Sequence, residues 1–280
     1  MPTFNITLED TSPMIHYSTN WRVGTSETDK YIDLYSEMSY TLTSNQGESF
    51  RLQFYGTGVT LFGARRPSHG IYSAQLDGGP AFSGTGMSEN GVPKQTLFSG
   101  NATLGMHTVT VVNEQDESFD LDYVTFQTSV GKENEHLIVN TYQDDHPSFI
   151  YTPASAWSTS SNKASWFSGS NGHFATQPSA IVTLTFEGEC KFDVPRDAIA
   201  LYGPVGPLGT AYSVQIDNNN STEYTTNTTS FFKANEVLFY GGNLGPGNHT
   251  VRVETSATPG DFAIDYANVY TTASLGGRYN

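Results

Sequence analysis

Apolar and polar residues alternate in short segments along most of the chain, and turn residues separate the segments. In IYSAQLDGG, Tyr72, Ala74 and Leu76 fall on one face of a strand, Ser73 and Gln75 fall on the other, and a turn-forming Asp-Gly follows. A period of two between Gly, Asn, Pro and Ser turns predicts β-strands. We count eight or nine candidate strands in each half of the chain. That number exceeds one sheet of usual size, so we expect β-sandwiches.

The segments recur in the same order, which indicates an internal duplication. VTLFGARRPSHGIYSAQLDGG (59–79) matches IALYGPVGPLGTAYSVQIDNN (199–219), and LFSGNATLGMHTVTV (97–111) matches LFYGGNLGPGNHTVRV (238–253). SFDLDYVTFQTS (118–129) closes the first copy as DFAIDYANVYTT (261–272) closes the second. We predict two tandem domains, residues 1–128 and 139–280, joined by a linker over residues 129–138. Extra residues near 187–197, including Cys190, are expected to form a protruding loop in the second copy.

These segments resemble the galactose-binding-like jelly rolls. The resemblance lies in an aromatic entry ending in Trp, a G-V-x-L-x-G strand, a Y-S-x-x-L-D-G strand, an L-F hairpin running into H-T-V-x-V, and a closing L-D-Y-V strand. The chain looks most like the tandem ectodomains of fungal cell-surface proteins, and it is similar to carbohydrate-binding modules of polysaccharide-degrading enzymes. The resemblance covers most of both copies and implies an all-β chain of two tandem jelly-roll sandwiches. Such domains bind many ligands or none, so the resemblance is less specific for function.

Composition narrows the class of protein. The chain has 28 acidic residues against 13 Lys and Arg, a formal charge of −15, which argues against a nucleic-acid partner because phosphate binding needs a concentrated basic surface. No apolar run reaches the roughly 18 residues of a membrane span, so we expect no membrane insertion. The opening MPTFNITLED lacks the features of a signal peptide, which leaves open whether a leader or anchor was removed. One cysteine allows no internal disulfide.

Asn-x-Ser/Thr sequons are frequent for this length and fit a secreted or cell-surface glycoprotein. They begin at Asn5, Asn101, Asn219, Asn220, Asn227 and Asn248.

Each copy ends in a strand-like segment that carries a carboxylate, Asp122 or Asp265, on its apolar face. A buried carboxylate without a partner is costly, so backbone N–H groups, a cation or a metal ion must compensate it. Acids also precede the aromatic entry of each copy, and the resemblance implies a structural Ca²⁺ at about this place. The candidate ligands are Glu9, Asp10, Asp122, Asp144, Asp145 and Asp265. The alternative is that each aspartate caps a turn and accepts backbone hydrogen bonds.

Candidate ligand-binding residues lie where the copies differ. Arg65, Arg66 and His69 in ARRPSHG could donate hydrogen bonds to a sugar, or they could form a solvated turn that balances local acidity. Trp166 lies among turn residues and could stack on a sugar ring, although large aromatic residues are usually buried. Tyr202 is the last of the candidate ligand-binding residues. Residues at matching positions in both copies are expected to be structural: Trp21, Trp157, His107 and His249.

Signatures of common enzymes are missing: the sequence has no G-x-S-x-G, H-E-x-x-H, P-loop or Rossmann motif. Glu187, Glu189 and Asp145 could supply the carboxylate pair of a glycoside hydrolase. The leading hypothesis is a non-catalytic glycan-binding protein, either lectin-like or a cell-surface ectodomain, whose partners are glycans or cell-wall polysaccharide. The alternatives are a carbohydrate-active enzyme, and a structural or adhesion ectodomain that binds no glycan.

Overall fold

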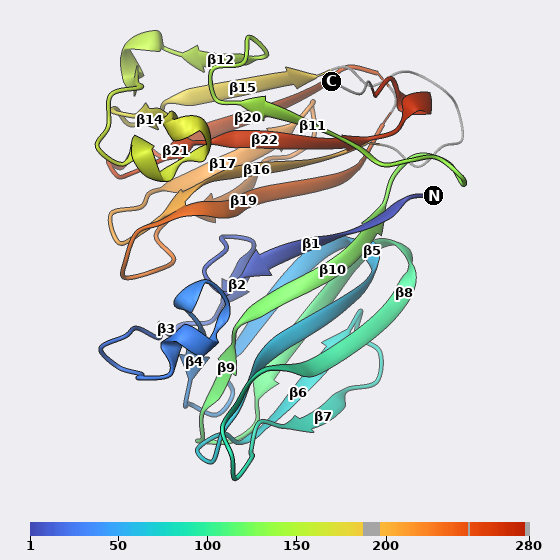
Figure 1. The fold of residues 1–280 in the computed structure, drawn as a ribbon, viewed down its shortest axis with the longest axis vertical. Coiled ribbons are helices and arrows are strands. Elements are labelled where there is room, and N and C mark those ends of the chain that lie inside the picture. The colour runs from blue at the N-terminus through green and yellow to red at the C-terminus, as the bar shows by residue number, and fades with distance from the viewer. Residues whose placement is uncertain (187–196, 246, 278–280) are drawn as a thin grey trace. The chain divides into compact units, whose positions relative to one another are not determined.

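The computed structural model describes residues 1–186, 197–245 and 247–277 (Figure 1). These residues form β-strands and short 3-10 helices. The N-terminal half contains β1 (Thr3–Glu9), β2 (Ile15–Tyr17), β3 (Arg22–Val23), η1 (Ile32–Leu34), η2 (Ser36–Met38), β4 (Thr41–Thr43), β5 (Ser49–Arg65), β6 (Ile71–Leu76), β7 (Phe82–Thr85), β8 (Val92–Asn113), β9 (Phe119–Leu121) and β10 (Tyr123–Ser129).

The C-terminal half repeats this order. It contains β11 (Ile138–Gln143), β12 (Phe149–Thr152), η3 (Ala154–Ala156), β13 (Trp157–Ser158), η4 (Ala164–Trp166), η5 (Ser168–Ser170), β14 (His173–Ala175), β15 (Ile181–Phe186), β16 (Asp197–Val205), β17 (Ala211–Ile216), β18 (Thr222–Thr225), β19 (Lys233–Leu244), β20 (His249–Thr255), β21 (Ala263–Ile264), β22 (Tyr266–Thr271) and η6 (Ala273–Leu275). Of the predicted insertion near 187–197, residues 187–196, with Cys190, lie outside the described residues.

The chain divides into two compact units, Phe4–Thr128 and Ser129–Asn280 together with Met1–Thr3. The predicted linker, 129–138, falls within the second unit and leads into β11.

In the first unit one antiparallel sheet forms both layers of a sandwich. Its strand order is β1-β10-β5-β8-β6-β7, with β2 also paired to β5. The long strands β5 and β8 pair from Ser49↔Val112 to Arg65↔Val92, with register shifts that include one between Gly56 and Gly58. The first half of β5 pairs with β2 and the second half with β10, so each long strand serves both layers.

In the second unit the two layers are separate sheets. One has the order β11-β22-β16-β19 and the other β12-β15-β20-β17-β18, as the ribbon in Figure 1 shows. Strands β15 and β16 thus take the place of the two halves of β5, and β19 and β20 take the place of β8. The predicted fold class, an all-β chain of two jelly-roll sandwiches, is confirmed.

Alternation along the strands places the apolar residues in the cores. Tyr72 and Ala74 are fully buried, while Ser73 and Gln75 between them and after them are partly exposed. In the second unit Trp157, Phe186, Tyr212 and Phe262 belong to one continuous apolar cluster. Because each buried aromatic or branched side chain contributes about 1.5–3 kcal/mol, these cores hold the loops of each sandwich in place.

Candidate functional site

Each copy places a small sheet and two 3-10 helices beside its closing strand. The small sheets are β3-β4-β9 in the first unit and β13-β14-β21 in the second. The helices η2 and η5 share a kinked backbone, with φ of 48° at Glu37 and 63° at Gly169. This turn directs the backbone N–H of Ser36 or Ser168 toward the acid of the closing motif, at 2.8 and 3.0 Å.

The acids of the closing motifs are buried, as their alternation predicts. Asp122 is fully buried and Asp265 is 1% exposed. Burial raises the pKa of Asp122 to about 7, the Ser36 hydrogen bond partly offsets the rise, and the charge of Glu9 adds to it. Burial likewise raises the pKa of Asp265 to about 6. Both carboxyls therefore hold a proton far more tightly than an exposed aspartate does.

Two of the predicted metal ligands, Glu9 and Asp122, both accept hydrogen bonds from Ser36 in the first copy. Glu9 accepts a hydrogen bond from the Ser36 hydroxyl at 3.0 Å, and Asp122 Oδ2 is a buried oxygen without a hydrogen-bond partner in the described chain. Asp10 lies apart from this pair, because its carboxylate accepts hydrogen bonds from the hydroxyls of Ser39 and Thr41 at 2.6 and 2.8 Å. The Glu9–Asp122 pair has the oxygen chemistry that Ca²⁺ requires, although protein carboxylates alone would fill few of its six to eight positions.

In the second copy the corresponding acids have other partners. Gln143 stands in the place of Glu9, and Asp145 is exposed. Asp144 Oδ2 lies 2.7 Å from His173 Nδ1, while its backbone N–H donates to Asp265 O at 3.0 Å. Within residues 1–186, 197–245 and 247–277, no group of three or more His, Cys, Asp or Glu side chains is arranged to hold a metal ion.

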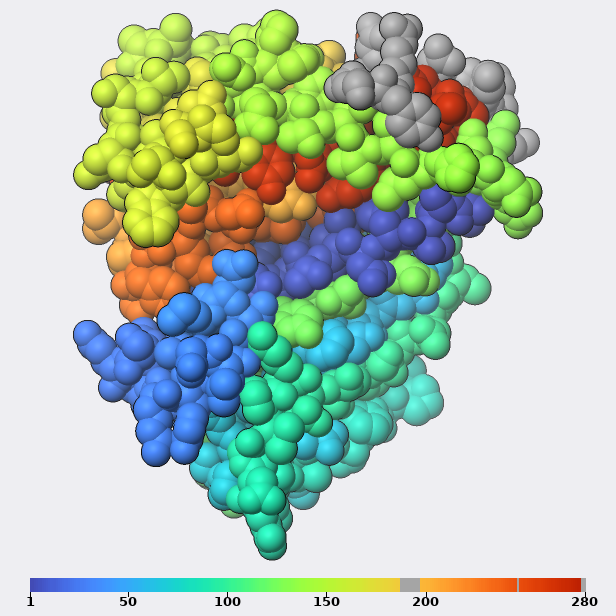
Figure 2. Space-filling model, viewed as in Figure 1, coloured from blue at the N-terminus to red at the C-terminus, as the bar shows by residue number. Residues whose placement is uncertain are grey.

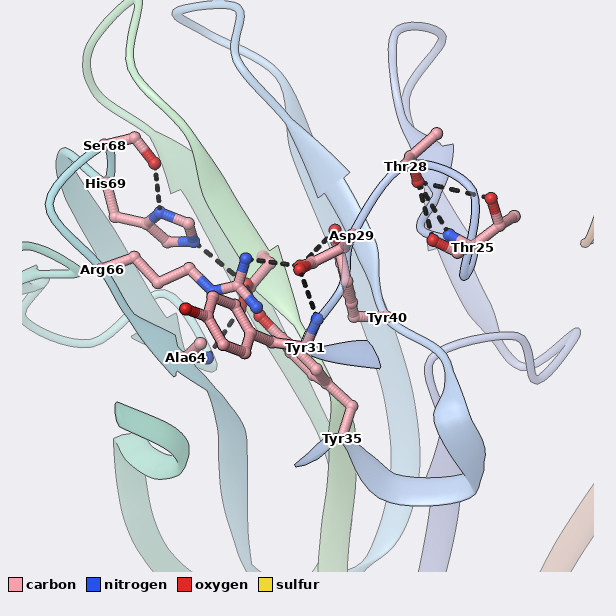
Figure 3. Close-up of polar contacts among 11 residues, drawn as sticks. Thr25, Thr28, Asp29, Tyr31, Tyr35, Tyr40, Ala64, Arg66, Ser68 and His69 are labelled. Atoms are coloured by element: carbon pink, nitrogen blue, oxygen red, sulfur yellow. Dashed lines mark hydrogen bonds and ion pairs between the residues drawn. The ribbon is translucent and has the colours of Figure 1, made fainter. Parts of the chain in front are cut away.

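A buried polar network occupies the loop end of the first copy (Figure 3). We use the term polar network for Asp29, Tyr35, Tyr40, Arg66, His69 and Asp120. Asp120 is 1% exposed and accepts three hydrogen bonds, from Tyr35 Oη at 2.6 Å, Ala64 N at 2.7 Å and His69 Nε2 at 3.0 Å. Because a carboxylate only accepts, His69 Nε2 must carry a proton.

The other half of the network is an ion pair between Arg66 and Asp29. Tyr40 Oη also donates to Asp29, at 3.0 Å, and the Arg66 guanidinium lies 5.1 Å from the ring centre of Tyr35 and 5.7 Å from that of Tyr40. Burial and the Asp29 carboxylate raise the pKa of Tyr40. The charged groups and hydrogen-bond donors in this part of the first copy thus have their partners within the same domain.

Ser68, His69 and Asp120 follow one another in contact, but Ser68 Oγ lies 3.4 Å from His69 Nδ1. That distance exceeds the 2.6–3.2 Å typical of a nucleophile and its base, and we assign the three residues no catalytic role.

The second copy carries small residues where the first carries the polar network. Shared hydrogen bonds define the equivalence: His69 N donates to Arg66 O as Gly209 N donates to Gly206 O. The residues that replace Asp29, Tyr40, Arg66, His69 and Asp120 are, in the same order, Ser161, Gly172, Gly206, Gly209 and Ala263. Four of these five small residues line a pocket of about 350 Å³, namely Ser161, Gly206, Gly209 and Ala263.

The pocket has an apolar floor and a charged rim. Its floor includes Val205 and Phe262, each 2% exposed, next to the fully buried Ala263. The side chains of Phe174, Leu208 and Phe232 contribute to its walls. At the rim, Lys163 Nζ pairs with Asp261 Oδ2 at 2.7 Å, and both side chains are well exposed.

An open groove adjoins this pocket. It is lined by Tyr151, Ala154, Trp157, Ser158, Thr159, Ser160 and His173, and its volume is about 560 Å³. The rings of Tyr151 and His173 stack at 3.8 Å, and Trp157 meets Tyr151 edge-on at 4.9 Å. Ser158 and Ser160 line both the groove and the pocket, so the two hollows meet there.

The two matching tryptophans differ in one polar contact. Trp21 Nε1 donates to Ser18 Oγ at 3.2 Å, whereas Trp157 Nε1 is buried without a hydrogen-bond partner in the described residues. A buried donor without a partner is costly, and the first copy avoids that cost through Ser18.

The predicted ligand-binding residues do not come together in one site. Arg66 and His69 belong to the polar network, and Arg65 donates to Thr96 O at 3.4 Å. Tyr202 stacks on Tyr266 at 4.4 Å. Trp166 is 73% exposed on η4, in the loop that stands out at the surface of the second unit (yellow in Figure 2). Of the predicted carboxylate pair, Glu187 and Glu189 lie outside the described residues.

Sequence reasoning missed the residues that form the pocket. Lys163, Phe174 and Phe232 belong to no repeated motif, and Asp261 begins the closing segment without matching an acid of the first copy. The strongest signal was available in the alignment of the copies, where ARRPSHG becomes PVGPLGT. Glycine replaces an arginine and a histidine in this segment, so the second copy has less side-chain volume there than the first.

Comparison with known proteins gives slight structural likeness. No family model matches the chain, and no curated protein matches it. A family two carbohydrate esterase from Cellvibrio japonicus is 12% identical with a TM-score of 0.34, over 46% of this chain and 35% of the esterase, so the chain spans about a third of that protein.

Two solved carbohydrate-binding modules are also similar. The CBM36-1 domain of a xylanase from the hindgut metagenome of Trinervitermes trinervoides is 16% identical with a TM-score of 0.31, over 47% of this chain and 95% of that domain. The tandem CBM22-1-CBM22-2 domain of a Paenibacillus barcinonensis protein is 8% identical with a TM-score of 0.30, over 94% of this chain and 96% of that one. Scores at this level assign no function to the chain. Within the described residues, no helix has the length and apolar character needed to cross a membrane.

Proposed function

We propose that the chain is a non-catalytic glycan-binding protein and that its second copy carries the binding site. The observation that supports this most is the aromatic groove of Tyr151, Trp157 and His173, edged by the hydroxyl groups of Ser158, Thr159 and Ser160. A sugar has apolar C–H faces and a rim of hydroxyls, so it needs aromatic surface and hydrogen-bonding groups together.

The groove offers both kinds of contact, and hydrogen bonds to Asp144 hold two of its rings in place. His173 is held by the Asp144 carboxylate at 2.7 Å, and Tyr151 Oη donates to Asp144 O at 2.7 Å. Fixed rings lose little entropy when a ligand binds.

The exposed Trp166 provides a second contact for a chain of sugars, since it lies three residues after Lys163 of the pocket rim. We also propose that the protein works outside the cell. The sequon asparagines Asn5, Asn101, Asn219, Asn220, Asn227 and Asn248 are all exposed, as acceptors of N-linked glycans must be.

A structural Ca²⁺ at Glu9 and Asp122 is proposed for the first copy alone. The buried Asp122 Oδ2 supports this assignment, because a cation would supply the partner that it lacks among the described residues. In the second copy an amide, Gln143, replaces one of the two carboxylates.

Glycan arrays followed by calorimetry on the whole chain test the proposed function. Ser160→Trp should fill the junction of groove and pocket and abolish binding. Trp166→Ala should weaken binding about five- to tenfold, the effect of one exposed aromatic contact. The matched control is Leu34→Ala, since Leu34 is the exposed apolar residue at the corresponding position of the first copy. Arrays and polysaccharide pull-downs without binding, or a Ser160→Trp variant that binds like the wild type, would overturn the proposal.

A further inference from the structure

We propose that the pocket beside the groove accepts a neutral aryl or acyl group carried by the bound sugar. The sugar part of this inference rests on the proposed function, whereas the apolar part rests on the pocket itself.

The pocket surface is unsuited to a second sugar unit. Its lining is mainly apolar, with Val205, Leu208, Phe174 and Phe232 among the side chains, and its hydroxyl groups come from Ser158, Ser160, Ser161 and Thr176. A sugar hydroxyl that left water for the apolar part of this surface would lose hydrogen bonds that the side chains there cannot replace. An aromatic or aliphatic group would instead bury its carbon surface against carbon.

The charged side chains at the rim are paired with each other, which argues against a charged ligand. Lys163 is paired with Asp261 at 2.7 Å, and its ammonium also lies 5.0 Å from the ring centre of Phe232. An anionic ligand would have to displace Asp261 from Lys163, and a cationic one would have to displace Lys163 from Asp261. A neutral group leaves this pair intact.

Size limits the group. A cavity of about 150 Å³ lined by apolar side chains holds benzene. At about 350 Å³, the pocket has room for one substituted ring or roughly two unsubstituted rings.

The pocket is open because of side chains and not because of the fold. In the first copy the turn makes the corresponding backbone hydrogen bonds from Arg66 N and His69 N, and there the polar network supplies large side chains at the equivalent positions. Gly206 is the replacement that leaves most room: a Cβ atom there would meet its nearest neighbours, Phe231 O and Phe232 Cα, at an ordinary 3.6 Å. A side chain at Gly206 can therefore be added without moving the backbone.

The groove and the pocket meet at Ser158 and Ser160, so one ligand can enter both. A glycan whose sugar lies on the aromatic groove would place a substituent on that sugar into the pocket. Esters and ethers of polysaccharide hydroxyl groups are substituents of this kind.

Calorimetric titration with paired glycosides tests the inference. The ligands are the methyl and benzyl β-glycosides of glucose, galactose, mannose and xylose, together with benzyl alcohol. For the sugar that binds, we expect the benzyl form to bind on the order of tenfold more tightly than the methyl form. Gly206→Leu should remove that difference and leave methyl glycoside binding unchanged. Gly91→Leu is the matched control, because a Cβ atom at Gly91 also has room and Gly91 lies in the first copy. Leu208→Ser, at a residue 67% exposed, reduces the apolar wall without a packing risk.

The possible outcomes separate the two proposals. Equal binding of methyl and benzyl glycosides would overturn the pocket assignment and leave glycan binding standing. If benzyl alcohol binds, Gly206→Leu abolishes that binding and no sugar adds to it, the pocket assignment would be supported and the proposal of glycan binding would be overturned. A benzyl preference that survives both Gly206→Leu and Leu208→Ser would also overturn the assignment.

Discussion

Removal of the Asp120 carboxylate should unfold the first domain at much lower denaturant concentration. Asp120, in β9, connects three parts of the first domain, because its donors are Tyr35 between η1 and η2, Ala64 in β5 and His69 in the turn before β6. Its oxygens accept from Tyr35 at 2.6 Å, Ala64 at 2.7 Å and His69 at 3.0 Å, and the side chain is 1% exposed. In Asp120→Ala these three donors would remain buried without an acceptor.

The magnitude follows from the number of donors. A buried donor that loses its partner costs about 1–3 kcal/mol. Three such donors, with some relaxation among them, give a loss of roughly 3–6 kcal/mol, which is a large part of the stability of an ordinary domain. Asp120→Asn keeps one acceptor oxygen, so we expect a loss about half as large.

Hydrogen exchange with mass spectrometry across a urea series can measure this loss domain by domain. Peptides from β5 and β10 report the first domain, and peptides from β15 and β20 act as an internal reference that should not change. Asp33→Ala is the control substitution, because Asp33 is an exposed aspartate in the same loop region. A loss below about 1 kcal/mol in Asp120→Ala would refute the reading of Asp120 as the shared acceptor of the network.

Three further substitutions and one double variant test the buried Asp122 and the ion pair. The pKa of Asp122 is raised from 3.8 to about 7, so its protonated form favours the folded state, and the stability of the first domain should fall as pH rises between those values. Asp122→Asn should abolish that fall. Ca²⁺ should raise the melting temperature of the wild type more at about pH 8 than at about pH 5, and it should leave the melting temperature of Asp122→Asn unchanged. A calcium effect of equal size in the two proteins would exclude this site. In the Asp29–Arg66 pair, Arg66→Gly and Asp29→Ser should each destabilise the domain. In urea melts, the double variant should lose about 1–3 kcal/mol less unfolding free energy than the sum of the two single losses. Strict additivity of the losses would mean that the ion pair contributes nothing.

Periodicity was enough to predict the sandwiches and the buried acids. Asp122 and Asp265 share their alternation faces with Val124 and Ala267, all of which are buried. Alternation reports only the face of a strand, however. Arg66 and His69 lie in a turn, where no periodicity applies, and their partners Asp29 and Asp120 are 37 and 51 residues away in sequence. Whether such residues point into solvent or into the domain depends on contacts that one sequence does not specify.

The pocket was harder to predict because it consists of missing side chains. Glycine and alanine in a β-rich chain normally indicate turns or close packing, and Gly209 fits that pattern, since a Cβ atom there would lie 2.3 Å from the backbone carbon of Thr226. Gly206 has no such constraint. Only comparison of the two copies separates a glycine that the backbone requires from one that leaves space.

The replacements that open the pocket make physical sense only as a group. If Gly206 stood opposite an aspartate at position 161, that carboxylate would lose the guanidinium that pairs with Asp29 in the first copy, and a buried charge without its partner typically costs about 3–5 kcal/mol. Likewise, an aspartate at position 263 would lose the donors that Tyr35 and His69 supply to Asp120, because Phe167 and Gly209 stand at the equivalent positions of the second copy. A domain of this fold therefore has two stable solutions at its loop end: a complete polar network, or an apolar pocket with no buried charge. Intermediate combinations leave donors or charges without partners. The first copy has the complete network and the second has the apolar pocket, so the same backbone provides a closed scaffold in one unit and space for a ligand in the other.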